Sequence, residues 1–491
     1  MKDFQTKLIA IFGEGNVSYD KESLKVYAEA EGFVCGLMPV AEVFAENEDQ
    51  VLQLIKLANE EKWHVIPVSS AGNHRHGGTT PAAPEVIMLN LSRMKKVTSI
   101  NPVFRMAVIQ PGLTYGEFQK ALDEFNLTIA MPLAPRAEKS VIASLLEVEP
   151  RMNPNTQWNV PDPIRSTDTI WGEGRRMYTG DASLGPNSIE EQQKNENWQI
   201  GSGGPDMVDY IRFLTGSQGT LGVVVNASVR LAQVPLVEKC FVVSSDDLDK
   251  NIEFMYAAEH LRFGDCLFTV NSATLAMLMA KTKDEIKCLT KELPKYITVV
   301  CAQSRNYAPQ LRVDAHTKGL SDAAAKNGLQ LLEAVGPFTA KQIHDVCFTP
   351  CQPGDYWKER FMGASADLLF ETTMNKVNGF VDIFNKEANK LSVDCSECGL
   401  YIQPQHQGVN CQVEFLIPYN PDCKTCKGLA EELFANASVA LSKADAYFHR
   451  PYGQLAKLQL SKDAMSYAAL EKIEKIFDPN EVLNPGKLKA F

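Results

Sequence analysis

The sequence predicts an α+β protein of two or three domains. At 491 residues the chain exceeds what one hydrophobic core organises, and 45% hydrophobic residues are enough to fill several cores. Helical and strand-like patterns alternate up to about residue 235, where strands begin to alternate with longer helices. We therefore expect a first domain over 1–235, a second over 236–445, and a segment over 446–491 that returns to the first.

Within the first domain, residues 41–60 place Val51, Leu52 and Ile55 on one face, which predicts an amphipathic helix, and a strand-like run follows at 63–70. The next expected elements are two strands and the helix after them, within 86–91, 104–112 and 116–126.

Residues 146–205 show little regular pattern and are rich in Asn, Pro, Gly and Gln, yet they contain Trp158, Trp171 and Trp198. We expect a long irregular surface loop or partner contact there. A helical start, a glycine turn and a β run follow over 210–232. In the second domain we expect helices at 249–261, 282–293 and 322–335.

The charge balance of 49 Lys and Arg against 60 Asp and Glu, a net charge of -11, disfavours nucleic acid and anionic lipid surfaces as partners. The chain shows neither a signal peptide at its start nor an apolar run long enough to span a membrane, so we expect a cytoplasmic protein.

Twelve cysteines are too sparse for a disulfide framework in so long a chain. Two C-x-x-C pairs, Cys395/Cys398 and Cys423/Cys426, stand further apart than zinc ligands usually do. We favour free thiols over a zinc or iron-sulfur site at these pairs, and we expect no metal.

The most informative segment is 67–81. Small residues at 69–72 allow a tight turn that aims successive backbone N–H groups inward, which suits a pyrophosphate. Gly77 and Gly78 would let a ligand approach the main chain. Neither a Gly-Lys-Ser/Thr phosphate loop nor a G-x-G-x-x-G motif occurs here, and an ordinary surface loop is the alternative.

Four further segments follow in a fixed order, at 108–118, 131–144, 213–231 and 476–488. Together with 67–81 they resemble the FAD-binding half of the vanillyl-alcohol oxidase and para-cresol methylhydroxylase superfamily, over 40–235 and 445–488. The resemblance implies an α+β fold with two domains. A two-subdomain FAD-binding domain binds FAD, and a cap domain built on an antiparallel sheet covers the isoalloxazine.

The resemblance also implies the cofactor-binding residues. The backbone of the turn lies on the pyrophosphate, Ser140 and Ser144 lie beside the phosphates or flavin, Thr220, Val223 and Val224 follow the adenine and ribose, and Asn484 and Lys487 reach the flavin edge. The turn and the residues that complete the set are Ser69, Ser70, Ala71, Gly72, Asn73, His74, Gly78, Thr79 and Pro132.

Three features indicate which branch of the superfamily the chain resembles. The 67–78 loop has the length found in the aryl-alcohol and cresol branch, and the histidine-rich metal segments of the 2-hydroxy-acid enzymes are absent. No histidine precedes Leu400 in the cap strand where many relatives anchor the flavin, so we expect non-covalent FAD. Arg136 and Ala137 replace the acidic residue of the aryl-alcohol oxidases, which argues against their oxidase half-reaction.

The candidate catalytic residues are Tyr401 and His406 in the cap and Arg450 and Tyr452 in the tail. An arginine holds a carboxylate or phenolate in a planar fork, and a tyrosine or a neutral histidine takes a hydroxyl proton. The alternatives are a structural role for His406 and, for Arg450, a surface pair with Asp445.

The expected function is an FAD-dependent dehydrogenase that oxidises a small alcohol or phenolic substrate by hydride transfer to flavin N5 and passes electrons to an acceptor protein. The alternatives are a 2-hydroxy-acid dehydrogenase of the lactate or glycolate type and a redox-inactive or electron-bridging subunit. We expect a homo-oligomer or a subunit of a larger complex.

Overall fold

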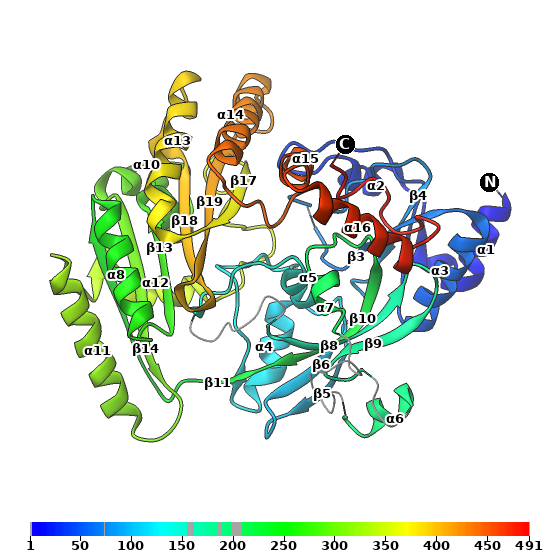
Figure 1. The fold of residues 1–491 in the computed structure, drawn as a ribbon, viewed down its shortest axis with the longest axis horizontal. Helices are drawn as coiled ribbons and strands as arrows, with labels where there is room; N and C mark the ends of the chain where they lie inside the picture. Colours follow the sequence, from blue (N-terminus) through cyan, green and yellow to red (C-terminus); the bar gives the residue numbers. More distant parts are fainter. Residues whose placement is uncertain (1, 73, 155–161, 184–187, 198–208, 491) are drawn as a thin grey trace.

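A computed structural model describes residues 2–72, 74–154, 162–183, 188–197 and 209–490 of the chain (Figure 1). Helices and sheets alternate throughout these residues, so the α+β prediction is confirmed. A part built from the start and the end of the sequence lies beside a part built from its middle (Figure 1).

The first sheet is mostly parallel and has the order β1-β2-β4-β3. Strands β2 and β3 both run parallel to the central β4, whose five residues are all buried. The strands are β1 (Val17–Ser18), β2 (Ala41–Phe44), β3 (His64–Val68) and β4 (Val86–Asn90). The helices before and between them are α1 (Lys2–Phe12), α2 (Lys21–Ala28) and α3 (Glu48–Glu61).

The expected helix over 41–60 is wrong in its first part. Residues 41–44 form strand β2, and helix α3 begins only at Glu48, where the Asn47 side chain accepts a hydrogen bond from the backbone N–H of Gln50. An N-cap of this kind satisfies a donor that the helix cannot pair internally. The apolar Ala41, Val43 and Ala45 suit a buried strand as well as a helix, and the cap separates the two.

The second sheet is antiparallel, with the order β5-β6-β10-β8-β9. Its strands are β5 (Val97–Asn101), β6 (Met106–Ile109), β8 (Ile164–Trp171), β9 (Arg176–Gly180) and β10 (Gly222–Arg230). Strands β7 (Leu127–Thr128) and β11 (Ala232–Gln233) form a separate pair. The helices of this part are α4 (Tyr115–Asp123), α5 (Val141–Leu146), α6 (Ile189–Lys194) and α7 (Ile211–Leu214). The elements expected within 104–126 and 210–232 are therefore present.

The expectation of an irregular loop over 146–205 is wrong for residues 164–180, which form β8 and β9. Polar residues hide β8 from a hydrophobicity pattern, because Ser166, Thr167, Asp168 and Thr169 are all buried. Their polar groups are satisfied inside the sheet: Arg176 on β9 donates to both Asp168 carboxylate oxygens, at 2.7 to 3.2 Å. Trp171 is buried at the end of β8, whereas Trp158 and Trp198 lie outside the described residues.

The middle of the chain folds around one antiparallel sheet of six strands, in the order β12-β14-β13-β18-β19-β17. The strands are β12 (Val237–Ser245), β13 (Cys266–Asn271), β14 (Tyr296–Ser304), β17 (Ala364–Thr372), β18 (Gly399–Gln405) and β19 (Asn410–Tyr419). A small hairpin of β15 (Ala334–Val335) and β16 (Phe338–Thr339) lies outside this sheet. We refer to this part as the cap.

Helices pack against the cap sheet (Figure 1). They are α8 (Leu248–His260), α9 (Ser272–Met279), α10 (Lys283–Glu292), α11 (Pro309–Lys326), α12 (Ala340–Cys347), α13 (Val377–Lys390) and α14 (Lys424–Lys443). Two predicted helices match α8 and α10. The third, over 322–335, is mostly wrong, because α11 ends at Lys326 and Gly328 turns the chain with a φ of 67°.

The last residues lie against the N-terminal part, through α15 (Gln454–Leu460) and α16 (Ala464–Phe477) (Figure 1). Phe477 stacks on Trp171 at a ring distance of 4.1 Å, and Leu483 bridges Val65 of β3.

Two findings concern the cysteines and the membrane. Cys395 and Cys398 are free thiols as expected, but Cys423 and Cys426 form a disulfide, so the free-thiol prediction is wrong for that pair. The C-x-x-C spacing at a helix start brings the two sulfurs together, since Cys423 is the N-cap of α14.

In the described ranges, no helix has the length and apolar character needed to cross a bilayer.

One buried carboxyl in the cap gives a stability prediction. Glu259 on α8 is 4% exposed, and within the described residues neither carboxylate oxygen has a hydrogen-bond partner. Burial raises its pKa from 4.5 to about 8. A raised folded-state pKa stabilises the fold below pH 4.5, and that contribution is lost as the pH rises through 8.

We expect Glu259→Gln to raise the melting temperature at pH 8 by several degrees, corresponding to about 2–4 kcal/mol, and to leave it nearly unchanged at pH 4.5. Thermal melts between pH 4.5 and 8.5 measure this difference. The matched control is Glu253→Gln at an exposed position of the same helix. Equal pH slopes in wild type and Glu259→Gln would contradict the assignment.

Candidate functional site

A long cavity runs from the loop after β3 to the cap sheet. Its walls come from five places: residues 67–79, residues 132–150 around α5, residues 214–224 before and in β10, the cap, and the tail after α14. Of the sequence-predicted residues, those that line it are Ser69, Ser70, His74, Gly78, Thr79, Pro132, Val223, Val224, Tyr401, Arg450 and Tyr452.

Two consecutive glycines give the loop its close approach to the cavity. Gly77 has a φ of 77°, and a Cβ there would lie 2.6 Å from the Val34 side chain. A Cβ on Gly78 would lie 2.9 Å from Cε1 of the Tyr452 ring. Neither position accommodates a side chain without a shift of its surroundings.

Asn484 and Lys487 hold this loop from behind rather than lining the cavity. The Asn484 side chain donates to the carbonyls of Gly78 at 2.8 Å and Gln218 at 2.6 Å, so it ties two cavity walls together. The Lys487 ammonium donates to the Gly77 carbonyl at 2.7 Å, and burial lowers its pKa to about 8. Both residues position the glycine loop.

Two predicted serines have their hydroxyls engaged outside the lining. Ser140 caps α5 by accepting from the Ala143 N–H at 3.1 Å, and its backbone N–H donates to the Ser70 hydroxyl at 3.0 Å. The Ser144 hydroxyl accepts from Tyr115 at 3.0 Å and donates to Glu149 at 2.5 Å.

The other predicted residues outside the lining are in turns. Thr220 donates to the Ser217 carbonyl at 2.9 Å, and Ala71 and Gly72 are exposed. Asn73 lies outside the described residues.

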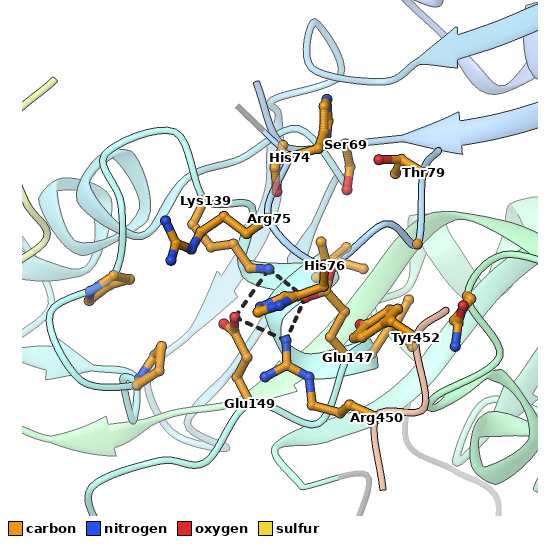
Figure 2. Close-up of a pocket in the computed structure, with 18 of the residues that line it drawn as sticks. Ser69, His74, Arg75, His76, Thr79, Lys139, Glu147, Glu149, Arg450 and Tyr452 are labelled. Carbon is orange, nitrogen blue, oxygen red and sulfur yellow. Dashed lines mark hydrogen bonds and ion pairs between the residues drawn. The ribbon is translucent and has the colours of Figure 1, made fainter. Parts of the chain in front are cut away.

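A cluster of two cations and two carboxylates occupies the cavity floor (Figure 2). Lys139 lies 2.7 Å from Glu147 and 3.2 Å from Glu149, and Arg450 lies 3.0 Å and 3.5 Å from the same two carboxylates. Burial opposes the Glu149 charge, but the two cations and the Ser144 hydroxyl together lower its pKa to about 2. Glu149 is therefore a fixed anion at neutral pH.

Arg450 is 4% exposed and does not pair with Asp445, so the surface alternative is excluded by its position. Its guanidinium faces the Tyr452 ring at 5.9 Å. Burial raises the pKa of Tyr452, which keeps its phenol protonated.

His76 stacks on Tyr452 at a ring distance of 5.3 Å (Figure 2). Burial and the nearby Arg450 charge lower its pKa well below 6.5, so its imidazole is neutral. His74 is also neutral. Burial is the larger cause, and the positive charges of Arg136 and Lys139 add to it, so that its pKa is lowered to about 3.

The cap wall of the cavity is aromatic, and it also contains a lysine whose positive charge is balanced by two carboxylates. Tyr356, Trp357 and Tyr401 line it together with Lys358. The Lys358 ammonium lies 3.1 Å from Asp367 and also pairs with Glu414.

Arg75 joins this wall through a hydrogen bond to Asp367 at 3.2 Å. It therefore connects the 67–79 loop to the cap sheet.

His406 lies apart from the cavity. It begins the short turn between β18 and β19, and burial together with Arg151 lowers its pKa. Tyr401, five residues earlier on β18, does reach the cavity, and its hydroxyl donates to Gln403 at 2.8 Å.

Several cavity residues escape sequence reasoning. They are Arg75, His76, Lys139, Glu147, Glu149, Lys358, Asp367 and Glu414. Arg75, His76 and Lys139 carried a signal, because they lie inside the segments 67–81 and 131–144 already singled out. The rest sit in unremarkable segments and come together only through the tertiary fold.

The cavity fits the expected FAD. Small residues leave its walls open along the loop, and at the turn before β10 a Cβ on Gly219 would lie 2.8 Å from Pro67. Two donors that line it, Arg450 Nε and Trp357 Nε1, are buried and have no acceptor among the described residues. A long cofactor with polar and aromatic parts would suit this shape and accept from Trp357 Nε1, which leaves Arg450 Nε for a second ligand.

Comparison with known proteins gives a domain and a fold. Residues 39–147 match the FAD binding domain family. The matched residues include the glycine loop and part of the charged cluster. The chain is 27% identical over 144 residues to the 4-cresol dehydrogenase [hydroxylating] flavoprotein subunit of Pseudomonas putida, a match that spans 29% of this chain and 28% of that protein. It is 20% identical to the mitochondrial D-lactate dehydrogenase [cytochrome] of Arabidopsis thaliana over 92% of this chain and 73% of that protein.

Among solved structures, the fold is similar to 4-ethylphenol oxidase from Gulosibacter chungangensis, with a TM-score of 0.83 and 15% identity over 100% of this chain and 98% of that one. It is also similar to p-cresol methylhydroxylase with substrate bound, with a TM-score of 0.82 and 17% identity over 99% and 97% of the two chains.

Proposed function

We propose that this chain, which has an FAD binding domain over residues 39–147 and the fold of p-cresol methylhydroxylase, is an FAD-dependent dehydrogenase of small alcohols or phenols. In this proposal the electrons leave to a protein acceptor, and the chain works as a homo-oligomer or as a subunit of a complex.

The observation that carries the proposal is that each of two cavity cations, Arg450 and Lys358, is already paired with carboxylates of the protein. Arg450 is within 3.5 Å of two carboxylates, and Lys358 pairs with Asp367 and Glu414. A substrate carboxylate would have to displace one of these anions from a buried pair, which costs several kcal/mol. A neutral alcohol or phenol avoids that cost, and Tyr356, Trp357 and Tyr401 offer it aromatic contacts.

When bound, FAD supplies the hydride acceptor at flavin N5. Ser69, Ser70, Gly78 and Thr79 line the cavity and would hold the cofactor, and Asn484 and Lys487 keep that loop in place. The cap wall excludes water from the reacting atoms.

For the substrate, the protonated Tyr452 donates a hydrogen bond and Arg450 orients the reacting oxygen. His76, stacked beside Tyr452, is neutral and accepts a hydrogen bond from the substrate hydroxyl.

A second candidate, a 2-hydroxy-acid dehydrogenase, is favoured by one observation. The similarity to the D-lactate dehydrogenase covers 92% of this chain, whereas the similarity to the 4-cresol dehydrogenase subunit covers 29%. The two candidates differ in the charge of the substrate, and the experiment below separates them.

The test is anaerobic mixing of the purified protein with alkylphenols, aryl alcohols and D-2-hydroxy acids, followed by flavin absorbance. We expect a yellow protein whose flavin is bleached by dithionite and also by a phenol or an aryl alcohol. Acid precipitation should release the flavin from the protein. Bleaching by 2-hydroxy acids alone would select the second candidate. A colourless protein that takes up no FAD would indicate the redox-inactive subunit instead.

A further inference from the structure

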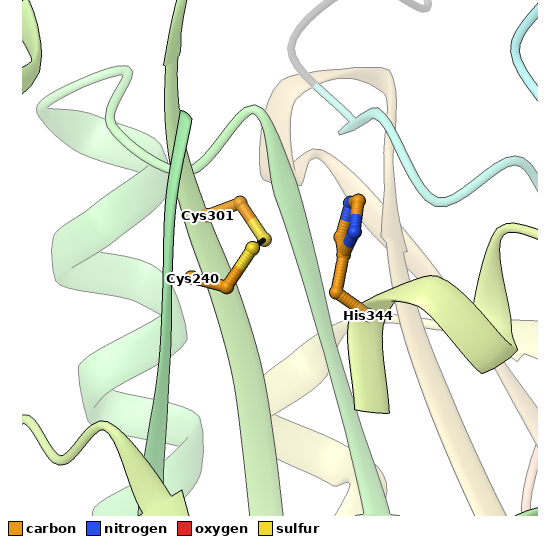
Figure 3. A group of neighbouring side chains, drawn as sticks. All are labelled: Cys240, Cys301 and His344. Atoms are coloured by element: carbon orange, nitrogen blue, oxygen red, sulfur yellow. Dashed lines mark hydrogen bonds between the residues drawn. The ribbon is translucent and has the colours of Figure 1, made fainter. Parts of the chain in front are cut away.

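Two cysteines and one histidine converge inside the cap, and none of the three lines the cavity (Figure 3). Cys240 on β12 and Cys301 on β14 are directly paired across the antiparallel strands, and their sulfurs lie 3.1 Å apart. His344 on α12 brings a ring nitrogen to them, so that all three ligand atoms lie within 4.8 Å of one another. Cys240, Cys301 and His344 are 9%, 0% and 7% exposed.

The imidazole of His344 is oriented as in a metal ligand. Its Nδ1 lies 3.4 Å from an Asp345 carboxylate oxygen, and its ring stacks on Phe348 at 4.3 Å. Its Nε2 is buried and has no hydrogen-bond partner within the described ranges. A carboxylate on one ring nitrogen leaves the lone pair of the other free for a metal, which is the usual second contact of a ligating histidine.

A carboxylate stands next to this open nitrogen. Glu238 on β12, two residues before Cys240, places an oxygen 3.6 Å from His344 Nε2, too long for a hydrogen bond. The Gln303 amide donates to the same Glu238 oxygen at 2.5 Å and fixes the carboxylate. Two sulfurs and one imidazole nitrogen therefore lie within 4.8 Å of one another, and the Glu238 carboxylate lies beside the histidine, outside that group of three.

We propose that Cys240, Cys301 and His344, with Glu238 as the fourth ligand, form a structural zinc site. Zinc takes four ligands from cysteine, histidine and carboxylate in tetrahedral geometry, with Zn–S of about 2.3 Å and Zn–N of about 2.0 Å. Those bond lengths separate two sulfurs by about 3.8 Å and a sulfur from a nitrogen by about 3.5 Å. To reach these values the two sulfurs must separate from 3.1 Å, the His344 nitrogen must approach them from within 4.8 Å, and the Glu238 carboxylate must turn toward the sulfurs.

The site adds a metal bridge between elements that already contact one another, because β12 pairs with β14 and Lys341 on α12 lies 3.5 Å from the Glu238 carboxylate on β12. Strands β12 and β14 form one edge of the cap sheet, and α12 lies over them. A zinc ion coordinated by both strands and the helix would fix α12, whose C-terminal neighbours lead to the aromatic wall at Tyr356 and Trp357. The proposed role is structural and is independent of electron transfer.

The test is metal analysis of the full-length holoprotein, prepared with an affinity tag that contains no histidine. We expect about one zinc per chain by mass spectrometry of metals. Cobalt substitution should give the red-region absorption of a tetrahedral thiolate site, where oxidised flavin does not absorb. Cys301→Ser and His344→Ala should each lower zinc to below about 0.2 per chain with FAD content unchanged. Cys398→Ser, a buried cap cysteine outside the cluster, is the control and should retain the zinc.

Three results would overturn the site. Wild-type protein that binds less than about 0.1 zinc per chain after exposure to zinc would do so without any variant. Zinc that persists in Cys301→Ser and His344→Ala would place it elsewhere. A Cys240–Cys301 disulfide in the freshly isolated protein would assign the close sulfurs to a covalent bond.

Discussion

Replacing Gly78 by valine is expected to yield a folded chain that carries less than about a tenth of the wild-type FAD. The first side-chain carbon alone would lie 2.9 Å from the Tyr452 ring, and the valine methyl groups extend further. Tyr452 would be driven into the cavity, or the loop that Asn484 holds would move away from it. Overpacking of this kind costs about 1–3 kcal/mol, which weakens binding roughly 5-fold to 150-fold.

The flavin-to-protein absorbance ratio after gel filtration measures this loss. Gly116→Val is the matched control, because Gly116 lies on α4 with nothing within 4 Å of its added Cβ. Full FAD occupancy in Gly78→Val would show that the cofactor does not depend on this loop. Loss of FAD in both variants would point to general destabilisation.

The glycine loop was predictable because its function depends on the backbone. Small residues in sequence are enough to predict a loop that approaches a cavity, and six of the nine residues named there, from Ser69 to Thr79, line the cavity. The failures at 41–44 and 164–171 have a different origin. Short apolar strands resemble helix starts, and the buried polar strand β8 is stabilised by Arg176, a partner that no local pattern reveals.

The charged residues of the cavity could not be predicted, because each has meaning only through partners distant in sequence. Glu147 and Arg450 are 303 positions apart, and Arg75 and Asp367 are 292 apart. The zinc cluster is of the same kind: Cys240 and Cys301 meet through the strand register of the cap, while the conspicuous C-x-x-C at Cys423 forms a local disulfide.

Arg450→Lys is expected to lower kcat/KM about 10-fold to 1000-fold, or roughly 1.4 to 4 kcal/mol of transition-state binding, with normal FAD content. Lysine keeps the positive charge beside Glu147 and Glu149 but loses the planar fork. The fork matters because one arm, Nη2, is held by these carboxylates while Nε remains without an acceptor in the described structure. A lysine ammonium that pairs with the carboxylates cannot also present a second N–H group to the substrate in a fixed direction, as a guanidinium can.

Steady-state kinetics with the substrate identified by flavin bleaching measure this effect, and Arg175→Lys is the control. Arg175 is an exposed arginine that pairs with Glu173 at 2.9 Å, and an exposed pair contributes about 0–1 kcal/mol, so its variant should keep wild-type kcat/KM. Wild-type turnover in Arg450→Lys would remove its orienting role. Apoprotein would mean that Arg450 serves the flavin, because the charge beside Glu149 is retained and only the geometry of the donors has changed.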